Sequence, residues 1–409
     1  MLISSTIDPI NPEGIVTPVT DPSRSWITTT EAAQRLGVKR ATLYAYVSRG
    51  VLRSERRPGQ QESLFDRSQI DAMASSTRAP GGPQPVLRFR SIATAVSSQA
   101  DGDLLYRGRP LADLVALGSF DEAADVVLGS PAAQEVPPPD KPLGFDLRAL
   151  PRQRRMPVAV QLLAAADPFA SDTDPDRVCL SALSTVRAAV ALVAGRPAAG
   201  ASTPSTDLAP LALEALGGSS SSRGDVAVLR VLLVALLDHG LTASTVAARV
   251  AASTRAGLHD CLSAAYAAMA GPLHGAAPVA AHALLAEGAD PVAVVARALR
   301  LHGGVPGFGH FLYPDGDPRA DVVLEALWRR RGTTRLRRRV EAVARVVADR
   351  TGGLPNIDLA SAAVLHALRL PAESGEVVFQ MARSVGVAAH VVEEYAEEPL
   401  RWRGRDPQG

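Results

Sequence analysis

The sequence has little cysteine and few aromatic residues, and each shortage excludes a class of protein. Two cysteines in 409 residues, Cys179 and Cys261, exclude a fold held together by disulfide bonds and indicate a reducing compartment. Cys261 lies in an alanine-rich helical segment, where we expect a core residue rather than a nucleophile. Aromatic residues make up 4% of the chain, so its alanine-rich helices should pack closely through small side chains.

No stretch of the sequence is apolar over the thickness of a bilayer, so we expect no membrane-spanning helix. The N-terminus lacks a basic region followed by an apolar run, which argues against a signal peptide. No P-loop is present to hold phosphate groups. We therefore expect a cytoplasmic protein with no membrane partner, no metal site and no tightly bound cofactor.

Charge is balanced over the chain as a whole but not along it. In total, 43 Lys and Arg residues stand against 42 Asp and Glu. From Arg24 to Arg90 the counts are 12 and 5, which leaves 31 and 37 for the rest. The length predicts two or three domains, and the local excess of basic residues predicts a polyanionic partner for the N-terminal one alone.

Residues 1–23 contain no Lys or Arg, and we expect a disordered leader there. Within residues 24–78, the pattern predicts a short helix ending at Gly37, a basic second helix over 38–47 and a two-stranded wing at 53–57 and 63–65. A closing helix should follow at 68–73. Residues 79–85, rich in proline and glycine, are predicted to be a linker.

The N-terminal pattern resembles the winged helix-turn-helix of excisionase- and MerR-type DNA-binding proteins. In that setting six residues would meet duplex DNA. Four would face the groove and two would reach phosphates: Lys39, Arg40, Thr42 and Tyr44, then Arg56 and Arg57. The alternative is a helical module that contacts another protein and uses arginine only for solubility.

Residues 86–405 are predicted to form a mainly α-helical body. An extended segment at 92–105 should lead into short helices at 111–117 and from Ser119, with Ser119 as cap and Glu122 three residues on. Apolar spacing then predicts helices over 178–194, 226–239, 242–270, 278–286, 291–301, 319–331, 336–349, 359–368 and 377–395. Loops are expected at 131–142 and 196–223.

Two histidines in this body lie in turns rich in glycine and proline. His274 belongs to GPLHGAA (271–277), and His310 ends VPGFGH (305–310), which is followed by DPRA (317–320). Such turns bring a side chain and bare backbone close to a ligand. Two of them, with an arginine after the second, indicate a functional site.

These motifs, together with Asn356-Ile357-Asp358, resemble the citrate synthase family, which includes 2-methylcitrate synthases. The resemblance extends through DH (238–239), TAST (242–245) and RSVG (383–386), and covers residues 92–405. It implies all-helical large and small domains, with the small CoA-side domain at roughly 275–375, and an acyltransferase that condenses acetyl-CoA with oxaloacetate.

That reaction removes a proton from a methyl group beside a thioester, which requires a base and stabilisation of the enolate oxygen. The resemblance assigns Asp358 as the base and His274 as the donor to the thioester oxygen, with His310 donating to the carbonyl of the 2-oxo acid.

Oxaloacetate is a dicarboxylate, and the arginine fork suits a carboxylate. The resemblance assigns His239, Arg319 and Arg383 to its binding. It takes a further arginine, best matched by Arg401, from the partner subunit, which implies a homodimer. Backbone groups of one loop would hold CoA: Val305, Pro306, Gly307, Phe308 and Gly309.

Each assignment has an ordinary structural alternative. Asp358 could cap the helix that follows, Arg383 could belong to a buried ion pair, and His239 could be a core histidine. Structural roles are expected for the other five histidines: His259, His282, His302, His366 and His390.

Three positions depart from the family pattern near the expected substrate sites. Phe311 stands where several relatives have arginine, Val387 where many have tryptophan, and Trp402 where proline is usual. They leave open a 2-methylcitrate synthase that uses propionyl-CoA. A metabolite-sensing DNA-binding regulator is a further alternative, but a sensor would not need the base Asp358.

Overall fold

The computed structural model describes residues 26–36, 38–48, 52, 54–55, 63–67, 69–71, 92–100, 102–131, 146–198, 207–219, 222–286 and 288–402. The chain divides into two compact units, Met1–Gln84 and Pro85–Gly409. The predicted leader and linker lie outside the described residues, as do Arg56, Arg57 and all but the first residue of the loop predicted at 131–142.

The N-terminal unit contains the two predicted helices, α1 (Thr29–Leu36) and α2 (Arg40–Ser48). The wing strands β2 (Ser54–Glu55) and β3 (Leu64–Asp66) pair antiparallel, and β1 (Trp26–Thr28) pairs with the other side of β3. The sequence pattern does not predict β1, because three residues are too few to show a strand period. Leu43, Phe65 and Ile70 form the centre of its small core.

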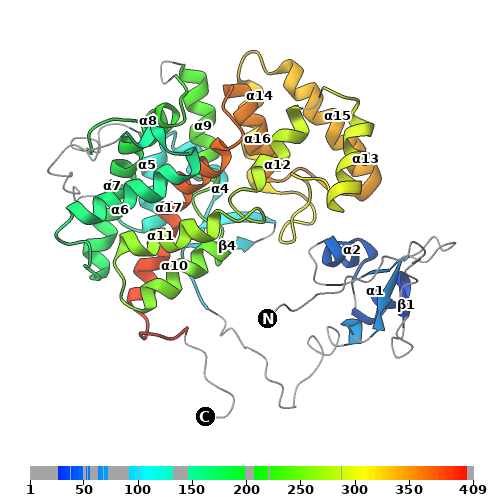
Figure 1. Ribbon diagram of the computed structural model, residues 1–409, viewed down its shortest axis with the longest axis horizontal. Coiled ribbons are helices and arrows are strands. Elements are labelled where there is room, and N and C mark those ends of the chain that lie inside the picture. Colours follow the sequence, from blue (N-terminus) through cyan, green and yellow to red (C-terminus); the bar gives the residue numbers. More distant parts are fainter. Residues whose placement is uncertain are drawn as a thin grey trace, which may run out of the picture. The chain divides into compact units, whose positions relative to one another are not determined.

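The body begins with the strands β4 (Ser97–Ala100), β5 (Asp103–Tyr106) and β6 (Arg109–Pro110), and is otherwise helical, which confirms the mainly α class (Figure 1). The helices are α4 (Leu111–Ala116), α5 (Phe120–Leu128), the 3-10 helix η1 (Leu147–Ala149), α6 (Arg152–Ala166), α7 (Pro175–Val193), α8 (Leu208–Ala215), α9 (Arg223–Ala235), α10 (Ala243–Ser253), α11 (Leu258–Met269), α12 (Ala277–Ala286), α13 (Pro291–His302), α14 (Pro318–Arg329), α15 (Thr334–Thr351), α16 (Ile357–Leu368) and α17 (Ser374–Tyr395).

Three of these features correct the sequence prediction. The helix expected over 242–270 is two helices, α10 and α11, because Arg255 adopts a positive φ of 65° and Gly257 is the N-cap of the second helix. A Cβ on Gly257 would lie 1.9 Å from the carbonyl oxygen of Ala170. The loop expected at 196–223 contains α8, and α6 is a helix that the pattern does not predict, since it contains Pro157.

Helix α17 lies at the centre of the larger helical group, and α5, α6, α7, α9, α10 and α11 pack against it. Nearly all of its 22 residues are buried. Gly386 allows the closest approach, because a Cβ there would lie 2.2 Å from the carbonyl oxygen of Leu237. The segment after α9, which carries His239, is therefore pressed against α17.

Helices α12 to α16 form a second group, drawn in yellow to orange in Figure 1. Helices α12 and α14 pack on α16, while α13 packs on α15. A separate small core of seven residues lies here: Leu284, Val294, Val295, Ala298, Val305, Val343 and Val347. The small domain predicted at 275–375 covers this group, and its limits stay a prediction.

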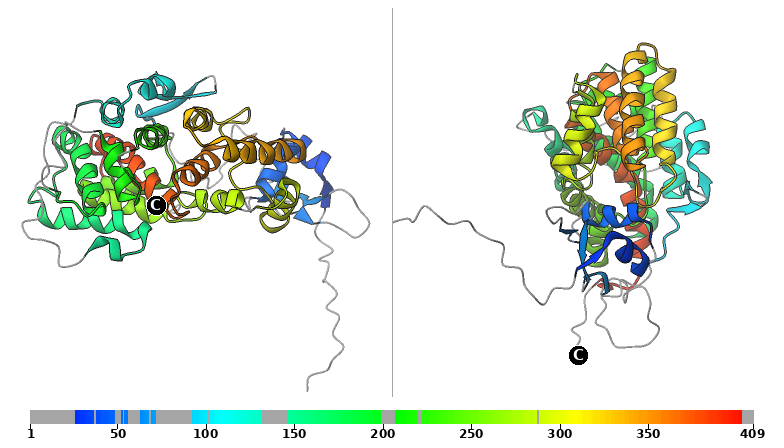
Figure 2. Two further views of the ribbon diagram at one scale, coloured as in Figure 1. Left: turned by 90° about the horizontal axis from the view of Figure 1, so that it is seen from above. Right: turned by 90° about the vertical axis from the view of Figure 1, so that its right-hand side faces the viewer.

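The β4–β5 hairpin lies along the outside of the helices (Figure 2) and fixes the segment after α9. The hydroxyl of Tyr106 donates to the carbonyl oxygen of Val234 at 3.1 Å, and Ser97 donates to the carboxylate of Asp238 at 2.5 Å. The amide of Gly240 donates to the Asp238 carboxylate at 2.8 Å. The turn that presents His239 is thus held from both sides.

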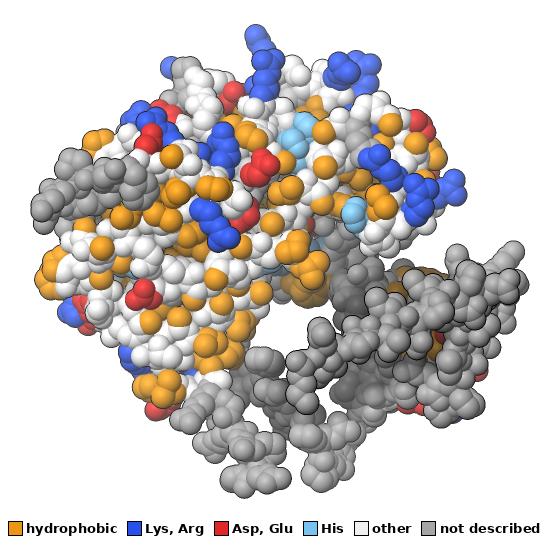
Figure 3. All heavy atoms as spheres, viewed as in Figure 1, with side chains coloured by type: hydrophobic (Ala, Val, Ile, Leu, Met, Phe, Trp, Pro, Cys, Tyr) orange, Lys and Arg blue, Asp and Glu red, His pale blue; other side chains and the backbone are white. Residues whose placement is uncertain are grey.

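Charged and hydrophobic side chains are interspersed on the face drawn in Figure 3. None of the helices within the described ranges is both long enough and apolar enough to cross a membrane.

Candidate active site

His274 lies in a tight turn between α11 and α12. Its amide donates to the carbonyl oxygen of Gly271 at 3.0 Å. Its Nε2 accepts from the backbone amide of Ser244 at 3.4 Å and is 2.8 Å from the Ser244 hydroxyl. A nitrogen that accepts from an amide carries no proton, so the proton of the neutral ring is on Nδ1.

The surroundings of His274 keep its ring neutral. Burial and the nearby guanidinium of Arg383 lower the pKa of His274 to about 4. Ser244 belongs to the first turn of α10, and the positive end of a helix dipole disfavours an imidazolium. Near neutral pH, His274 is therefore a hydrogen-bond donor through Nδ1 and not a cation.

His239, His310 and Tyr313 form one aromatic cluster. The ring centroids of the two histidines are 5.2 Å apart, edge to face, and the Tyr313 hydroxyl is 3.0 Å from Nε2 of His239. The amide of Leu312 donates to Nδ1 of His310 at 3.2 Å, which places the ring proton of His310 on Nε2. Burial, then Arg319 and Arg383, lower the pKa of His239.

Asp317 connects the arginine of the DPRA turn to the start of α16. Its carboxylate accepts two hydrogen bonds from the guanidinium of Arg319, at 2.9 and 2.8 Å. One of its oxygens also accepts from the amide of Ile357 at 3.0 Å. The guanidinium of Arg319 lies 5.5 Å from the ring centre of Tyr313, so this buried pair joins the histidine cluster to the helix that carries Asp358.

Asp358 is not the cap of α16. The side chain of Asn356 is the cap, because its oxygen accepts from the amides of Asp358 at 3.0 Å and Leu359 at 3.4 Å. The capping alternative for Asp358 is therefore wrong. Burial raises the pKa of Asp358 to about 6; Arg319 opposes this rise and Asp317 adds to it. A carboxylate with a raised pKa is a stronger base than an exposed one.

The side chain of Arg383 is buried, with 1% of its surface exposed. It forms no ion pair with a described residue. Its Nε donates to the carbonyl oxygen of Leu236 at 3.0 Å and one terminal nitrogen donates to Thr242 at 3.3 Å. The guanidinium lies 4.6 Å from the ring centre of Phe379. The ion-pair alternative thus finds no support, and a buried cation of this kind favours an anionic ligand.

The glycine-rich loop at 305–309 is fastened to the segment before α16. The amide of Gly309 donates to Leu354 at 2.7 Å, and the amide of Asn356 donates to Gly307 at 2.9 Å. Gly307 has φ +86°, and a Cβ there would lie 2.8 Å from that of Leu359. Position 307 therefore requires glycine. The loop is attached directly to the start of α16, the helix that carries Asp358.

Arg401 is not among the residues that this chain gathers around the histidines. Its guanidinium makes two 2.6 Å hydrogen bonds to Glu394, near the end of α17, and pairs with Glu397 at 3.1 Å. Trp402 donates to the same Glu394 at 2.9 Å. The role expected for Arg401 in the site of a partner subunit stays a prediction.

The other departures from the family pattern have definite places. Phe311 stacks on His310, with ring centroids 5.1 Å apart, and remains largely exposed. Val387 is fully buried in α17. An exposed aromatic ring beside His310 is thus the departure that can meet a substrate.

Four residues that the sequence does not single out complete the arrangement: Ser244, Tyr313, Asp317 and Phe379. The only available signal was their place in or beside the recognised motifs, since Ser244 belongs to TAST and Asp317 to DPRA. Within the described part of the chain, no group of three or more His, Cys, Asp or Glu side chains could hold a metal ion.

The groove-facing residues predicted in the N-terminal unit are all exposed: Lys39, Arg40, Thr42 and Tyr44. Arg40 donates to the Thr30 hydroxyl, and the Tyr44 hydroxyl is 3.3 Å from that of Thr29. These contacts hold the two side chains against α1 without burying them.

Comparison with protein-family models identifies both units. Residues 86–404 match the model described as citrate synthase, C-terminal domain, and residues 26–78 match a helix-turn-helix domain model.

Known proteins resemble the body over most of its length. A citrate synthase of Deinococcus radiodurans is 29% identical over 357 residues, which is 78% of this chain and 92% of the relative. A citrate/2-methylcitrate synthase of Bacillus subtilis is 36% identical over 175 residues, 41% of this chain and 47% of the relative. The solved ternary complex of carboxymethyl coenzyme A and oxaloacetate with citrate synthase from Thermoplasma acidophilum superposes with a TM-score of 0.61 at 25% identity, covering 78% and 93% of the two chains.

Proposed function

Because the chain belongs to the citrate synthase family, we propose that it condenses acetyl-CoA with oxaloacetate to give citrate and CoA. One observation carries the proposal. Two histidines that accept hydrogen bonds on opposite ring nitrogens, a carboxylate with a raised pKa and two buried arginines all lie in or beside the family motifs. The reaction requires two hydrogen-bond donors, one base and fixed cations.

In the first step, the carboxylate of Asp358 takes a proton from the methyl group of the thioester. The electron pair of the broken C–H bond forms the enolate, whose oxygen accepts from Nδ1–H of His274. The raised pKa of Asp358 reduces the difference between its pKa and that of the weakly acidic methyl C–H bond. The neutral donor His274 stabilises the negative charge that develops on the enolate oxygen.

In the second step, the enolate carbon attacks the carbonyl carbon of oxaloacetate. The electron pair of the carbonyl π bond moves onto the carbonyl oxygen, which accepts a hydrogen bond from Nε2–H of His310. The resulting alkoxide takes up one proton, which balances the proton that Asp358 removed, and His310 stays neutral. Water then hydrolyses the thioester of the citryl-CoA, which releases citrate and CoA.

The two carboxylates of oxaloacetate would bind Arg319 and Arg383, with His239 beside them. Arg319 uses Nε and one terminal nitrogen on Asp317, so the other edge of its guanidinium keeps donors for a substrate. Arg401 of a second copy would complete the site in a homodimer. The loop at 305–309 would hold CoA through backbone groups. We place the protein in the cytoplasm.

The test is Asp358→Asn, assayed by thiol release and by calorimetry with oxaloacetate. Oxaloacetate affinity should stay within about threefold of wild type, because its arginines remain. Condensation should fall by roughly two orders of magnitude or more, because the base is lost. Turnover within about tenfold of wild type would remove Asp358 from that role.

The acyl donor is a separate question, because one of the relatives is named for both citrate and 2-methylcitrate. We propose acetyl-CoA as the better substrate. Comparing kcat/KM for acetyl- and propionyl-CoA with oxaloacetate decides this, and a higher value for propionyl-CoA would make the protein a 2-methylcitrate synthase.

The N-terminal match and its exposed basic side chains favour a second activity, binding of duplex DNA. A regulator that only senses the metabolite would bind DNA and oxaloacetate but release no thiol with either acyl-CoA. The two assays together therefore separate an enzyme from a sensor.

A further inference from the structure

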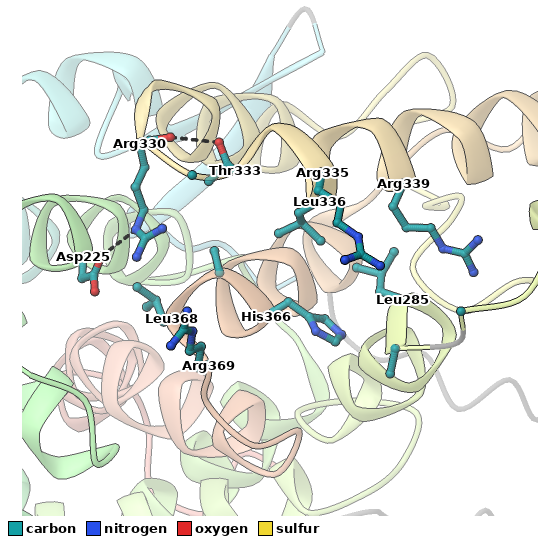
Figure 4. A pocket seen from close by; sticks show the side chains of 14 residues that line it. Asp225, Leu285, Arg330, Thr333, Arg335, Leu336, Arg339, His366, Leu368 and Arg369 are labelled. Atoms are coloured by element: carbon teal, nitrogen blue, oxygen red, sulfur yellow. Dashed lines mark hydrogen bonds and ion pairs between the residues drawn. The ribbon is translucent and has the colours of Figure 1, made fainter.

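A cavity of about 670 Å³ lies at the far ends of the helices that carry the active-site residues (Figure 4). Helices α12, α14 and α16 begin beside His274, Arg319 and Asp358, and the residues at or just beyond their C-terminal ends line the cavity. Since α16 has 12 residues, it spans about 18 Å. The cavity is therefore separate from the active site.

Arginine is the most frequent residue in the lining of the cavity. The four arginines are Arg330, Arg335, Arg339 and Arg369, and the ring of His366 lies among them. Asp225 is the acidic residue of the described lining, and it already pairs with Arg330 at 2.5 Å. Figure 4 shows Arg335 of α15 directed toward the ring of His366 on α16.

Two of these cations have no balancing group within the described ranges. Arg335 and Arg369 are exposed and form neither a hydrogen bond nor an ion pair with a described residue. Arg339 is fixed at the wall, where it donates to the carbonyl oxygen of Ala289 at 2.7 Å. Among the described residues, the lining thus has an excess of positive charge that an anionic ligand would neutralise.

Helix dipoles do not account for this excess. Arg330 and Arg369 follow the C-terminal ends of α14 and α16, where a cation is stabilised. Arg335, however, lies in the first turn of α15, where the dipole disfavours a cation. The side chain of Thr333 does not cap this helix but donates to Arg330 at 2.9 Å. The first-turn amides of α15 therefore add to the attraction for an anion.

The rest of the lining includes several apolar side chains and one fixed aromatic ring. Leu285, Leu336 and Leu368 contribute side chains, and the ring of His366 stacks on His282 with centroids 3.9 Å apart. Nε2 of His366 is 3.0 Å from the carbonyl oxygen of His282, which fixes the ring. Inorganic phosphate alone would leave this surface unused, whereas an organic group joined to phosphates would cover it.

We propose that this cavity binds an organic polyphosphate, a small metabolite with at least two phosphate groups and an apolar or aromatic part. Guanidinium groups bind phosphate through paired hydrogen bonds. A ligand here joins α15 to the end of α16, whose other end carries Asp358. Binding therefore alters condensation, a consequence that rests on the proposed function.

Calorimetry on the full-length protein tests the site, with ATP and tripolyphosphate as probes. The test variant combines Arg335→Gln with Arg369→Asn, because position 369 has φ +56° and asparagine tolerates that backbone. The matched control is Arg338→Gln, an exposed arginine on the same helix that does not line the cavity. The double variant should bind ATP at least tenfold more weakly, and the control within twofold of wild type.

The probes and variants separate this site from other basic surfaces. ATP binding tighter than tripolyphosphate supports a role for the apolar lining, while binding of citrate in preference to both overturns the phosphate assignment. The N-terminal unit and the loop at 305–309 are unchanged in the double variant. Equal ATP affinity in the double variant and wild type, or no binding to either, therefore overturns the proposal.

The effect on the reaction is a second readout. ATP should change the rate of thiol release by wild type and the Arg338→Gln control, and should not change that of the double variant. If wild type releases no thiol, the proposed function fails, while calorimetry still decides whether the cavity binds a polyphosphate.

Discussion

At the scale of single residues, the chemistry depends on which nitrogen of each histidine holds its proton. The motifs point to His274 and His310, but not to their tautomers. The tautomer of His274 is set by Ser244 on another helix, and that of His310 by the backbone amide of Leu312 in the same loop. The same holds for Asp358, whose pKa depends on its burial next to Arg319 and Asp317. The sequence therefore points to the residues proposed to react, but not to the groups that set their protonation.

We predict that Ser244→Ala lowers kcat by about tenfold and leaves oxaloacetate affinity unchanged. The variant removes the hydroxyl beside Nε2 of His274, while the amide of residue 244 remains. Thiol-release kinetics and calorimetry measure the two quantities. An unchanged kcat would show that the amide alone fixes the tautomer. Ser263→Ala serves as the control, because Ser263 lies on α11 outside the motifs and its hydroxyl contacts Gln161 and His259 instead of His274.

The pH dependence of kcat/KM should show an acidic limb near pH 6. Below that value Asp358 binds a proton and cannot accept one from the substrate, so kcat/KM should fall about tenfold per pH unit. Initial rates between pH 4.5 and 8 measure the limb. A flat profile down to pH 5 would contradict the raised pKa.

The same shift predicts a pH-dependent effect on stability. Because the pKa of Asp358 rises from 3.8 to about 6 on folding, its protonated form favours the folded state at low pH. This contribution is lost as pH rises through about 6. Asp358→Asn should therefore raise Tm by about 2–5 °C at pH 8 and leave it unchanged near pH 4. Scanning calorimetry at pH 4 and pH 8 measures the change in Tm at each pH. A larger rise in Tm at pH 4 than at pH 8 would contradict the prediction.

At the scale of elements, apolar spacing predicts the helices that carry their own start and stop signals. Helix α13 begins at Pro291 behind the cap Asp290 and ends before Gly303 in the left-handed region, close to its predicted limits. The break between α10 and α11 also carries a local signal that the apolar spacing overlooks, because Gly257 is the N-cap of α11. The contact with the loop at Ala170, which leaves no room for a side chain at this glycine, shows only in the structure.

We predict that Gly257→Ala destabilises the body by about 2–4 kcal/mol, because the new methyl group meets the carbonyl oxygen of Ala170. Gly304→Ala is the control, since a Cβ there has no neighbour within 4 Å. Thermal melts of both variants give the comparison. Similar Tm values for the two would mean that the 170–171 loop moves away at little cost.

At the scale of the whole molecule, the sequence separates a basic N-terminal unit from a mildly acidic body, and the matched family models cover each part. The sequence does not show whether the body requires the N-terminal unit for condensation or dimerisation. Every residue assigned to the chemistry lies at or beyond His239, which argues that it does not.

Deleting residues 1–85 should therefore leave condensation and dimerisation within about twofold of the full-length values. Thiol release and light scattering measure them. A truncated protein that is folded and dimeric but inactive would show that the N-terminal unit contributes to the body's site.

Residues 24–78 should bind duplex DNA with a steep salt dependence, since each phosphate contact releases counterions. Arg40→Ala and Tyr44→Ala should reduce sequence preference, while Arg56→Ala with Arg57→Ala should weaken binding to all sequences. Fluorescence anisotropy at several salt concentrations measures both effects. Absence of retained DNA at low salt would exclude this activity.

The carboxylate of Asp317 holds both Arg319 and the start of the helix that carries Asp358. Under the proposed function, an attempt to evolve this body toward a different 2-oxo acid would have to change Arg319. Any such change disturbs Asp317, and with it the position of the base. A substitution of Arg319 that changes substrate selectivity should therefore also change the rate. A new substrate would require a second, compensating substitution at or near Asp317.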